Sequence, residues 1–563
     1  MTRKSTLGLA ISIALASSGA FAALDRTGDF ALLDQKGGFH QLSRYQHRKG
    51  VVLMAYDQAC QNMSGMMAQF NELRGRFAGE DFEFLLIDPK GHDRAALQGL
   101  ELDVPILQDS GQLVAEALGM TRAGDVRVLN PDRISVYYSG AMATELGDTL
   151  AAVLAGPVRN TVKSDNPSPC GIDYPVRDAQ MADVADYATE IAPIILDNCV
   201  VCHREFGVGP FAIDSYTSLL GWSPMIKEVL LNKRMPPAQV DPSIGHSPSA
   251  RYIPTESIQR LVHWLSAGAP RGDGPDPLAD FSYEESSQWL MGEPDLVVTA
   301  PPQFIPATGV LDYIYADVEL PFDEDKWVVG VQIRPVATSA LHHLMAFVTG
   351  PEEDFWGEER NASTSTRRFL EGYSPGEIRA EKFTEGTAVL IPKGSKLSMQ
   401  FHYVGIGAEL RDETRIGFYF ADPKDIPHLR ERKVQAVSAS VVIPPNAHTV
   451  PAHAQYQFDK PVVISGVRAK MNARGKNMKF SVEHPDGSLQ DILSVPAYNY
   501  GWQPHYVLSE PVTVPAGSKV HVTGAFDNSV SNPFNPDPNA EVHSSLESTD
   551  EMFTGYFTFH ELE

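Results

Sequence analysis

The chain has 563 residues, of which 43% are hydrophobic and 21% are charged, and its formal net charge is −25. This length argues against a single domain and predicts three or four. The acidic balance argues against nucleic acid or an anionic membrane surface as a partner, because binding phosphate groups needs a basic face.

Residues 1–22 have the pattern of a signal peptide. Arg3 and Lys4 give a positive start, residues 7–16 form an apolar run too short to span a bilayer, and Ala20-Phe21-Ala22 is an A-x-A cleavage site. The alternative is an uncleaved anchor. Since no later run reaches about eighteen apolar residues, we expect a periplasmic protein that does not insert into the membrane after cleavage.

Residues 24–160 alternate between strand and helix patterns, which indicates an α/β domain. A helical stretch runs from Cys60 through Phe77. Strands are predicted within Gly28–Asp34, Gly50–Tyr56, Asp81–Ile87 and Val126–Tyr138.

This segment resembles thioredoxin-like and peroxiredoxin-like (redoxin) domains, with Cys60 at the position of their reactive cysteine. A helix N-terminus lowers the pKa of a thiol there. Met63 stands where a CxxC motif has its second cysteine, and Asp57 stands where peroxidatic sites have Thr or Ser. The resemblance therefore implies either a degenerate redoxin fold used for docking or, alternatively, thiol catalysis.

Residues 161–185 are predicted to be a linker, because the stretch around Cys170 is rich in proline. Residues 186–275 follow as a predicted all-α cytochrome c domain. Its helices are expected at Ile191–Asn198, Trp222–Leu231 and Ile258–Ala267.

Cys199-Val200-Val201-Cys202-His203 is the pattern of covalent haem c attachment. Two thiols three residues apart can form thioethers to the haem vinyl groups, and His203 can ligate the iron from the same side. The alternatives are a disulfide or half of a zinc site, but no second CxxC or zinc-finger histidine pair lies nearby.

Met235, in Lys233-Arg234-Met235-Pro236-Pro237, is the predicted distal iron ligand. A Met/His pair raises the haem potential and suits electron transfer. His246 lies in a loop predicted to be exposed, and His263 lies on an amphipathic helix where core packing is expected. If haem uses two of the four cysteines, Cys60 and Cys170 remain and can form one disulfide in an oxidising compartment.

From about Glu293 onward, short alternating strands separated by Pro and Gly predict two consecutive antiparallel β-sandwiches, 290–428 and 429–563. They divide near Ile426–Lys433. Strands are predicted at Asp312–Leu320, Lys326–Arg334 and Leu397–Tyr403.

The first sandwich contains His342 and His343 in one strand and His402 in another. Adjacent residues of a strand face opposite sides, so both histidines can share a metal only at a twist or bulge. Three neutral imidazoles suit copper, with zinc the main competitor.

Trp327–Phe347, the turn 372–376 and Gln400–Tyr403 resemble the copper type II, ascorbate-dependent monooxygenases, which include peptidylglycine α-hydroxylating and dopamine β-monooxygenases. The resemblance implies that His342, His343 and His402 hold the electron-donating copper. Met552 matches the thioether ligand of the oxygen-binding copper.

The two histidines that accompany that thioether in the family are missing, because Lys470 and Asn472 stand at their positions. A protonated lysine cannot ligate and an Asn carbonyl is a poor soft-metal donor, so the second copper is expected to be absent or rebuilt. Four other histidines are candidates for rebuilding it, and no spacing selects among them: His448, His453, His505 and His543.

Two functions are compatible with these patterns. The first is an oxidoreductase in which a periplasmic partner reduces the haem, the haem reduces copper, and dioxygen is the acceptor; fusion gives the haem a high effective concentration. The second is a non-hydroxylating electron-transfer, redox-sensing or copper-binding assembly protein. No recognisable pocket identifies a peptide or small-molecule substrate.

Overall fold

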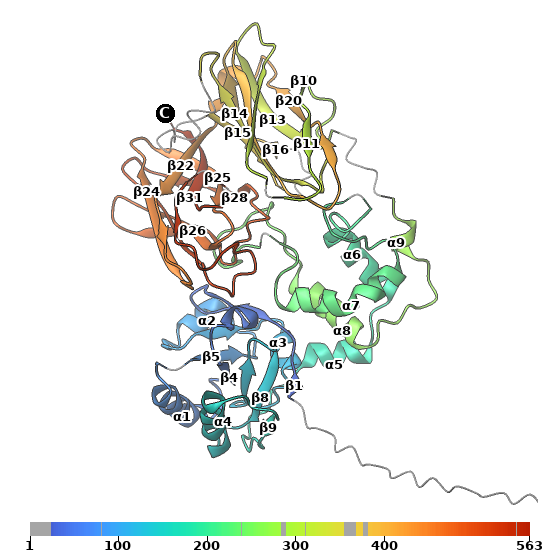
Figure 1. Cartoon of the computed structure of the whole chain (residues 1–563), viewed down its shortest axis with the longest axis vertical. Coiled ribbons are helices and arrows are strands. Elements are labelled where there is room, and N and C mark those ends of the chain that lie inside the picture. The colour runs from blue at the N-terminus through green and yellow to red at the C-terminus, as the bar shows by residue number, and fades with distance from the viewer. Residues whose placement is uncertain are drawn as a thin grey trace, which may run out of the picture.

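The computed structural model describes residues 24–79, 81–205, 207–237, 239–282, 289–309, 311–353, 368–374, 381–545, 547 and 549–562. The signal peptide predicted at 1–22 and two residues of the turn 372–376, Pro375 and Gly376, lie outside these ranges. Among the described helices none has the length and apolar character needed to cross a membrane. Figure 1 shows an α/β domain at the bottom, a helical segment at the right, and two β-rich parts above and to the left.

The N-terminal α/β domain is built on a seven-stranded sheet of order β1-β8-β7-β4-β5-β6, with β9 paired to β8. Its central strand is Gly50–Ala55, whose six residues are all buried, as expected for a strand covered on both faces. The elements are β1 Asp25–Arg26, β2 Ala31–Leu33, β3 Phe39–Gln41, η1 Leu42–Tyr45, β4 Gly50–Ala55, α1 Met63–Arg76, β5 Phe82–Asp88, α2 Arg94–Gln98, β6 Ile106–Gln108, α3 Leu113–Ala117, β7 Val126–Asn130, β8 Ser135–Gly140, α4 Thr144–Ala155 and β9 Val162–Lys163.

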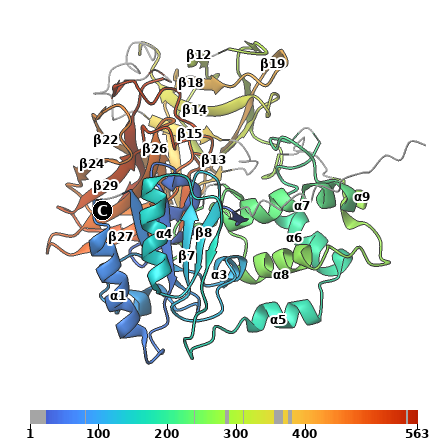
Figure 2. The same ribbon diagram turned by 60° about the horizontal axis from the view of Figure 1, so that its bottom comes forward.

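Apolar side chains cover both faces of this sheet. Phe70 of α1 and Leu150 of α4 pack on one face, while Leu42 of η1 and Val114 of α3 pack on the other. In the view of Figure 2, α1 and α4 lie side by side in front of the sheet. The sheet thus forms the middle layer of three.

Two sequence predictions for this domain need correction. Val126–Tyr138 is a hairpin of two strands, since the turn after Asn130 reverses the chain. The segment 161–185 is not a free linker: β9 extends the sheet, Gly171 bridges to Arg122, and residues 175–182 form helix α5. Backbone pairing with the domain accounts for the difference, because Pro-rich composition alone does not show where the amide groups bond.

The described elements between 175 and 280 are all helical. They are α5 Pro175–Ala182, the π-helix η2 Tyr187–Ile191, α6 Ala192–Asn198, α7 Tyr216–Leu231, α8 Thr255–Ser266 and α9 Pro277–Asp280. Helix α7 begins six residues before the predicted Trp222, because Ser215 and Ser218 form a capping box at its N-terminus. Tyr187, Leu219 and Trp264 lie in the core of this helical segment.

The first β-rich part consists of two sheets that enclose one apolar core, and we call it the first sheet pair. One sheet has the order β10-β20-β13-β17-β21 with β16 on β13, the other has the order β12-β18-β14-β15, and β11 pairs with β19. The strands are β10 Leu296–Thr299, β11 Gln303–Ile305, β12 Ile314–Glu319, β13 Lys326–Arg334, β14 Leu341–Thr349, β15 Arg368–Tyr373, β16 Glu381–Lys382, β17 Thr387–Ile391, β18 Lys396–Tyr403, β19 Leu410–Asp412, β20 Arg415–Phe420 and β21 Arg430–Glu431. A short helix, η3 Ile426–His428, precedes β21.

The second sheet pair begins at Lys433. Its two main sheets have the orders β22-β31-β25-β28 and β24-β29-β26-β27, and β23 pairs with β30. The strands are β22 Lys433–Ala439, β23 Val442–Ile443, β24 Val450–Gln457, β25 Val462–Lys470, β26 Gly475–Glu483, β27 Leu489–Val495, β28 Tyr506–Val514, β29 Lys519–Phe526, β30 Val542–His543 and β31 Phe553–Glu561. The chain is therefore a multidomain protein with a large β-rich C-terminal region.

Buried ion pairs join the two sheet pairs. Glu371 of β15 accepts hydrogen bonds from Arg468 of β25, at 2.7 Å, and from Arg432, at 3.2 Å. All three side chains are at most 5% exposed. Removing one partner of such a cluster leaves an uncompensated buried charge, so the contact holds the two parts in one arrangement.

The other modules meet around a cavity of about 860 Å³. Asp241, between α7 and α8, is ion-paired with Arg94 of α2, and its backbone N–H donates to the Ser494 carbonyl of β27 at 2.9 Å. On the same side of the molecule, the rings of His47 and His448 lie 3.9 Å apart across the contact between the α/β domain and the second sheet pair.

This histidine contact predicts a loss of stability in acid. Burial, the neighbouring His448 and Arg48 lower the pKa of His47 to about 4, from an ordinary value of 6.5. Because the folded state disfavours protonation, the free energy of unfolding should be fully present above about pH 6.5 and should decline as the pH falls towards 4.

Thermal unfolding at pH 7.5 and pH 5 checks this prediction. The melting temperatures at pH 7.5 and pH 5 should differ less in the variant His47→Gln than in the unmodified protein. As a control, His543→Gln alters an exposed ring on the second sheet pair and should leave the difference unchanged. Equal pH dependence in all three proteins would contradict the assignment.

Candidate functional site

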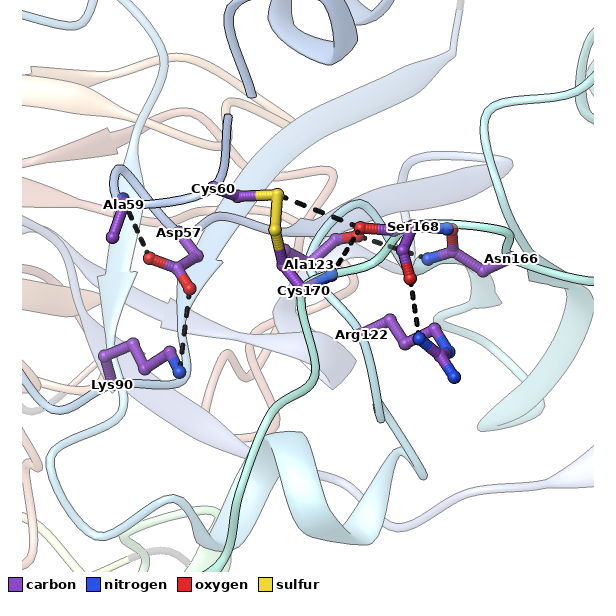
Figure 3. The surroundings of a disulfide bond; sticks show 9 residues. All are labelled: Asp57, Ala59, Cys60, Lys90, Arg122, Ala123, Asn166, Ser168 and Cys170. Carbon is purple, nitrogen blue, oxygen red and sulfur yellow. Dashed lines mark hydrogen bonds and ion pairs between the residues drawn. A yellow bond between two sulfur atoms is a disulfide. The ribbon is translucent and has the colours of Figure 1, made fainter. Parts of the chain in front are cut away.

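Cys60 and Cys170 are joined by a disulfide in the α/β domain (Figure 3). Cys60 is 4% exposed and lies three residues before the start of α1, whereas Cys170 is partly exposed. Ser168 lies beside the bond, with its Oγ 3.8 Å from Cys60 Sγ. The redoxin position is therefore occupied by a half-cystine whose partner is 110 residues further along the chain.

The chain around Cys170 is a strap across the domain. The Ala123 N–H donates to the Cys170 carbonyl at 2.9 Å, and Arg122 Nη1 donates to the Ser168 carbonyl at 2.6 Å (Figure 3). Met63, where a CxxC would have its second cysteine, is buried in the core. The disulfide and these hydrogen bonds hold the strap against the domain.

Asp57 occupies the position where peroxidatic sites have Thr or Ser. Its carboxylate accepts the Ala59 N–H at 2.9 Å and lies 3.6 Å from Lys90 Nζ. Figure 3 shows it turned away from the disulfide. This arrangement offers thiol–disulfide exchange at the Cys60–Cys170 bond, for which the more exposed Cys170 is the accessible end.

We predict that the double variant Cys60→Ser/Cys170→Ser loses roughly 2–4 kcal/mol of unfolding free energy in the α/β domain. The cross-link restricts a long loop of the unfolded chain, and serine cannot form it. Denaturant unfolding followed by a probe in the α/β domain measures the change. Reduction of the unmodified protein should reproduce it, and an unchanged midpoint in both would show that the strap holds without the bond.

The attachment motif follows directly after α6. The N–H groups of Cys202 and His203 both donate to the Cys199 carbonyl, at 3.1 and 2.9 Å, so the motif continues as a tight turn. The two thiols are not bonded to each other. Burial raises the pKa of the Cys199 thiol to about 12, which keeps it protonated at neutral pH.

The His203 ring has a fixed orientation. Its Nδ1 lies 3.2 Å from the Phe211 carbonyl, and the two rings are 4.5 Å apart. When Nδ1–H donates to a carbonyl, the lone pair of Nε2 is left to bind a metal, which is the usual arrangement of a metal-ligating histidine. Gly209 makes room for the ring, because a Cβ there would lie 2.7 Å from Nδ1.

Met235 lies after the end of α7, where its N–H donates to the Val229 carbonyl at 3.2 Å. It lines the cavity of about 860 Å³, and the described residues around that cavity include neither cysteine of the motif nor His203. His246 is exposed. His263 is 2% exposed and has both ring nitrogens engaged, with Gln180 and Glu116, in agreement with the core position expected for it.

The three histidines of the first sheet pair come together. His342 and His343 are in β14, and His402 is in the neighbouring strand β18. The register shifts between Leu341, opposite Tyr403, and His343, opposite His402, so His342 is an extra residue in a bulge. One ligand atom from each side chain lies within 4.8 Å of the other two.

Burial sets the protonation of this cluster. His343 is 3% exposed and His402 is 6% exposed. Desolvation, with smaller contributions from Lys470 and the neighbouring rings, lowers the pKa of His342 to about 3 and that of His402 to about 4. The imidazoles are therefore neutral at pH 7, as metal ligation requires.

Two tyrosines that sequence reasoning missed complete this site. The ring of Tyr313 lies 5.5 Å from that of His343 and 5.1 Å from that of His402. Tyr500, from the second sheet pair, places its hydroxyl 3.1 Å from His402 Nδ1. No local sequence signal marks Tyr500, because it follows His402 by 98 residues in another part of the fold.

The positions predicted for a second copper hold a different arrangement. Lys470 is 3% exposed, its Nζ has no hydrogen-bond partner among the residues that the structure describes, and burial lowers its pKa to about 7. Asn472 donates its amide N–H groups to the carbonyls of Glu547 and Asp550 and accepts from the Tyr313 hydroxyl at 3.5 Å. Met552 is partly buried just before β31.

The other candidate histidines do not assemble near these positions. His448 contacts the ring of His47 at a tilt, His453 bonds to His521, His505 bonds to Thr558, and His543 is exposed beside Glu541. Within the described ranges, His342, His343 and His402 form the single group of three or more potential ligands that is this close together.

Comparison with known proteins characterises the N-terminal α/β domain. The model of the AhpC/TSA family matches residues 24–137. Together with the sheet topology, this match shows a thioredoxin-like redoxin domain, which indicates a redox function in general. The match covers neither the helical segment nor the two sheet pairs, and no curated protein matches the chain.

Solved structures similar to this chain include a hypothetical protein from Sinorhizobium meliloti, which is 19% identical, with 27% of this chain and 95% of that one covered and a TM-score of 0.24. Peroxidoxin BcpB from Mycobacterium tuberculosis is 23% identical, with 24% and 99% covered and a TM-score of 0.21. A thiol:disulfide interchange protein from Bacteroides is 13% identical, with 24% and 92% covered and a TM-score of 0.20.

Proposed function

We propose that the chain is a periplasmic oxidoreductase that carries haem c in its helical segment and one copper in its first sheet pair. The observation that carries the proposal is the buried cluster of His342, His343 and His402, with ligand atoms within 4.8 Å of one another. Three neutral imidazoles suit copper, with zinc as the competitor. The redoxin domain adds a third redox module.

The haem would be held by thioethers to Cys199 and Cys202 and by His203 on the iron, and it would supply one-electron transfer. The free thiols and the orientation of His203 by the Phe211 carbonyl support this assignment. Met235 is the proposed distal ligand. Its side chain lines the cavity at the junction of the helical segment, the redoxin domain and the second sheet pair.

Copper in the histidine cluster would accept and release one electron. The protein supplies three imidazoles, keeps them neutral by burial, and excludes water with Tyr313 and Tyr500. Electrons would pass from a periplasmic donor through the haem to this site, with the modules held together by the ion pairs of Glu371 and Asp241. Dioxygen is a proposed final acceptor.

A non-hydroxylating function is the second candidate, and a specific observation favours it. The oxygen-binding copper of the copper type II monooxygenases needs two histidines. At their positions this chain has Lys470, whose Nζ is buried, and Asn472, whose side chain bonds to backbone carbonyls. Electron transfer, redox sensing or copper-binding assembly would need the three-histidine site alone. The redoxin cysteine, Cys60, is in a disulfide and is not a free thiol, which supports the same second candidate.

The haem assignment predicts that Cys199→Ala/Cys202→Ala loses all covalent haem, because no thiol remains to form a thioether. His203→Ala should lose the proximal ligand. Met235→Ala should keep covalent haem and lose the sulfur-to-iron absorption band. Haem staining of denatured protein and visible spectra measure these outcomes.

A matched control for the attachment motif is Cys60→Ser/Cys170→Ser, which removes the other two cysteines and should retain haem. Covalent haem in Cys199→Ala/Cys202→Ala would contradict the attachment site. An unchanged spectrum in Met235→Ala would move the distal ligand to another residue.

The copper assignment predicts one tightly bound copper for each chain. His402→Ala should lose most of the affinity, on the order of a hundredfold or more if one coordinate bond contributes about 3 kcal/mol, and should leave the haem spectrum intact. Metal analysis after dialysis measures the stoichiometry. His543→Ala removes an exposed histidine and should bind copper normally.

Two tightly bound coppers, with the second lost in Met552→Ala, would show that other residues have rebuilt the oxygen site. Dioxygen consumption would then favour hydroxylation over the second candidate. One copper without turnover would favour electron transfer or assembly.

A further inference from the structure

The loop between β27 and β28 crosses from the second sheet pair to the histidine cluster of the first. Tyr500 lies in this loop, and its ring centroid is 4.6 Å from that of His342. Its hydroxyl is 3.1 Å from His402 Nδ1. A methyl group on the next residue, Gly501, would be 3.7 Å from His342 Nε2. The loop therefore contacts two of the three imidazoles.

Bonds within the second sheet pair hold this loop in place. Gln503 Nε2 donates to the Tyr500 carbonyl at 2.8 Å, and the Gly501 N–H donates to Asn499 Oδ1 at 2.9 Å. Tyr498 is buried, and its hydroxyl donates to the Met471 carbonyl at 2.6 Å. The position of Tyr500 is thus set by its own sheet pair, independently of the histidines.

The Tyr500 hydroxyl faces a ring nitrogen of the histidine cluster. A neutral imidazole accepts a hydrogen bond through the same nitrogen lone pair that a metal uses. Since the hydroxyl faces Nδ1 of His402, a cation bound there would meet the hydroxyl oxygen directly. The Tyr500 hydroxyl is also hydrogen-bonded to Tyr313, which would hold it in place when a cation replaces the contact with His402.

We propose that the three-histidine site belongs to both sheet pairs, with the Tyr500 hydroxyl oxygen as the fourth group facing a bound cation of the copper or zinc class. This inference rests on the proposed function, since it concerns the same three histidines. Three imidazoles leave one position of a tetrahedral cation open. A group on the opposite sheet pair fills it only while the two parts stay docked, so cation binding fastens the loop to the first sheet pair.

Hydrogen exchange of the full-length, haem-loaded protein tests the proposal, with copper(II) or zinc(II) added as the probe. Peptides covering residues 496–505 should exchange at least tenfold more slowly when the cation is bound. The comparison needs no variant, so it holds even if a substitution in the loop disturbs folding. Unchanged exchange of these peptides with the cation bound would overturn the proposal.

Tyr500→Phe gives the second readout. The ring is kept and the oxygen is lost, so the three histidines should still bind the cation about tenfold more weakly, and the protection of 496–505 should disappear. The copper(II) paramagnetic resonance spectrum should also change. The matched control is Tyr456→Phe, which removes the hydroxyl of an exposed tyrosine on β24 and should alter none of the three measurements.

The outcomes separate the two proposals. If the unmodified protein binds no cation, the copper site and the role of Tyr500 both fail. If a cation is bound and His402→Ala loses it, while Tyr500→Phe keeps full affinity and an unchanged spectrum, the copper site stands and the shared site is refuted.

Discussion

The bulge at His342 is the constraint on which the candidate metal site depends. In a regular strand, His342 and His343 would face opposite sides of the sheet, and one of them would point away from His402. The extra residue in β14 reverses this alternation once, and all three rings then meet with centroid separations of 5.1–5.6 Å. The three histidines of the first sheet pair come together because of one irregularity in the hydrogen-bond register.

The position of the cluster within the fold adds a second condition. The histidines lie near the ends of β14 and β18, where the first sheet pair faces the second. Tyr500 covers them there, and Lys470 approaches from β25. The ion pairs of Glu371 with Arg432 and Arg468 hold these edges in register. The pKa values of the imidazoles are low because burial removes water from the site and because Lys470 of the second sheet pair adds a nearby positive charge.

Much of this arrangement could be predicted from the sequence. The buried strand around Gly50–Ala55, the strands carrying the three histidines and the division before Lys433 follow from apolar patterning and turn residues, which are local properties. The need for a bulge followed from the adjacency of His342 and His343. The AhpC/TSA match agrees with the redoxin resemblance over residues 24–137.

Other features depend on contacts between distant parts of the chain, and no local pattern reports them. Tyr500 reaches the cluster from another sheet pair. The stretch before α5 reads as a linker by composition, yet it is bonded along the redoxin domain. The cavity lined by Met235 is formed by three modules, so its existence depends on their docking and not on the residues around Met235.

The disulfide between Cys60 and Cys170 imposes an order of events on the maturation of this protein. An oxidant that forms this bond also acts on Cys199 and Cys202, which are three residues apart and carry free thiols. The haem attachment proposed for this motif would need that second pair reduced. Biogenesis would then require one cysteine pair to be oxidised while the other is shielded or kept reduced, and mispairing among the four thiols is the error that the cell would have to prevent.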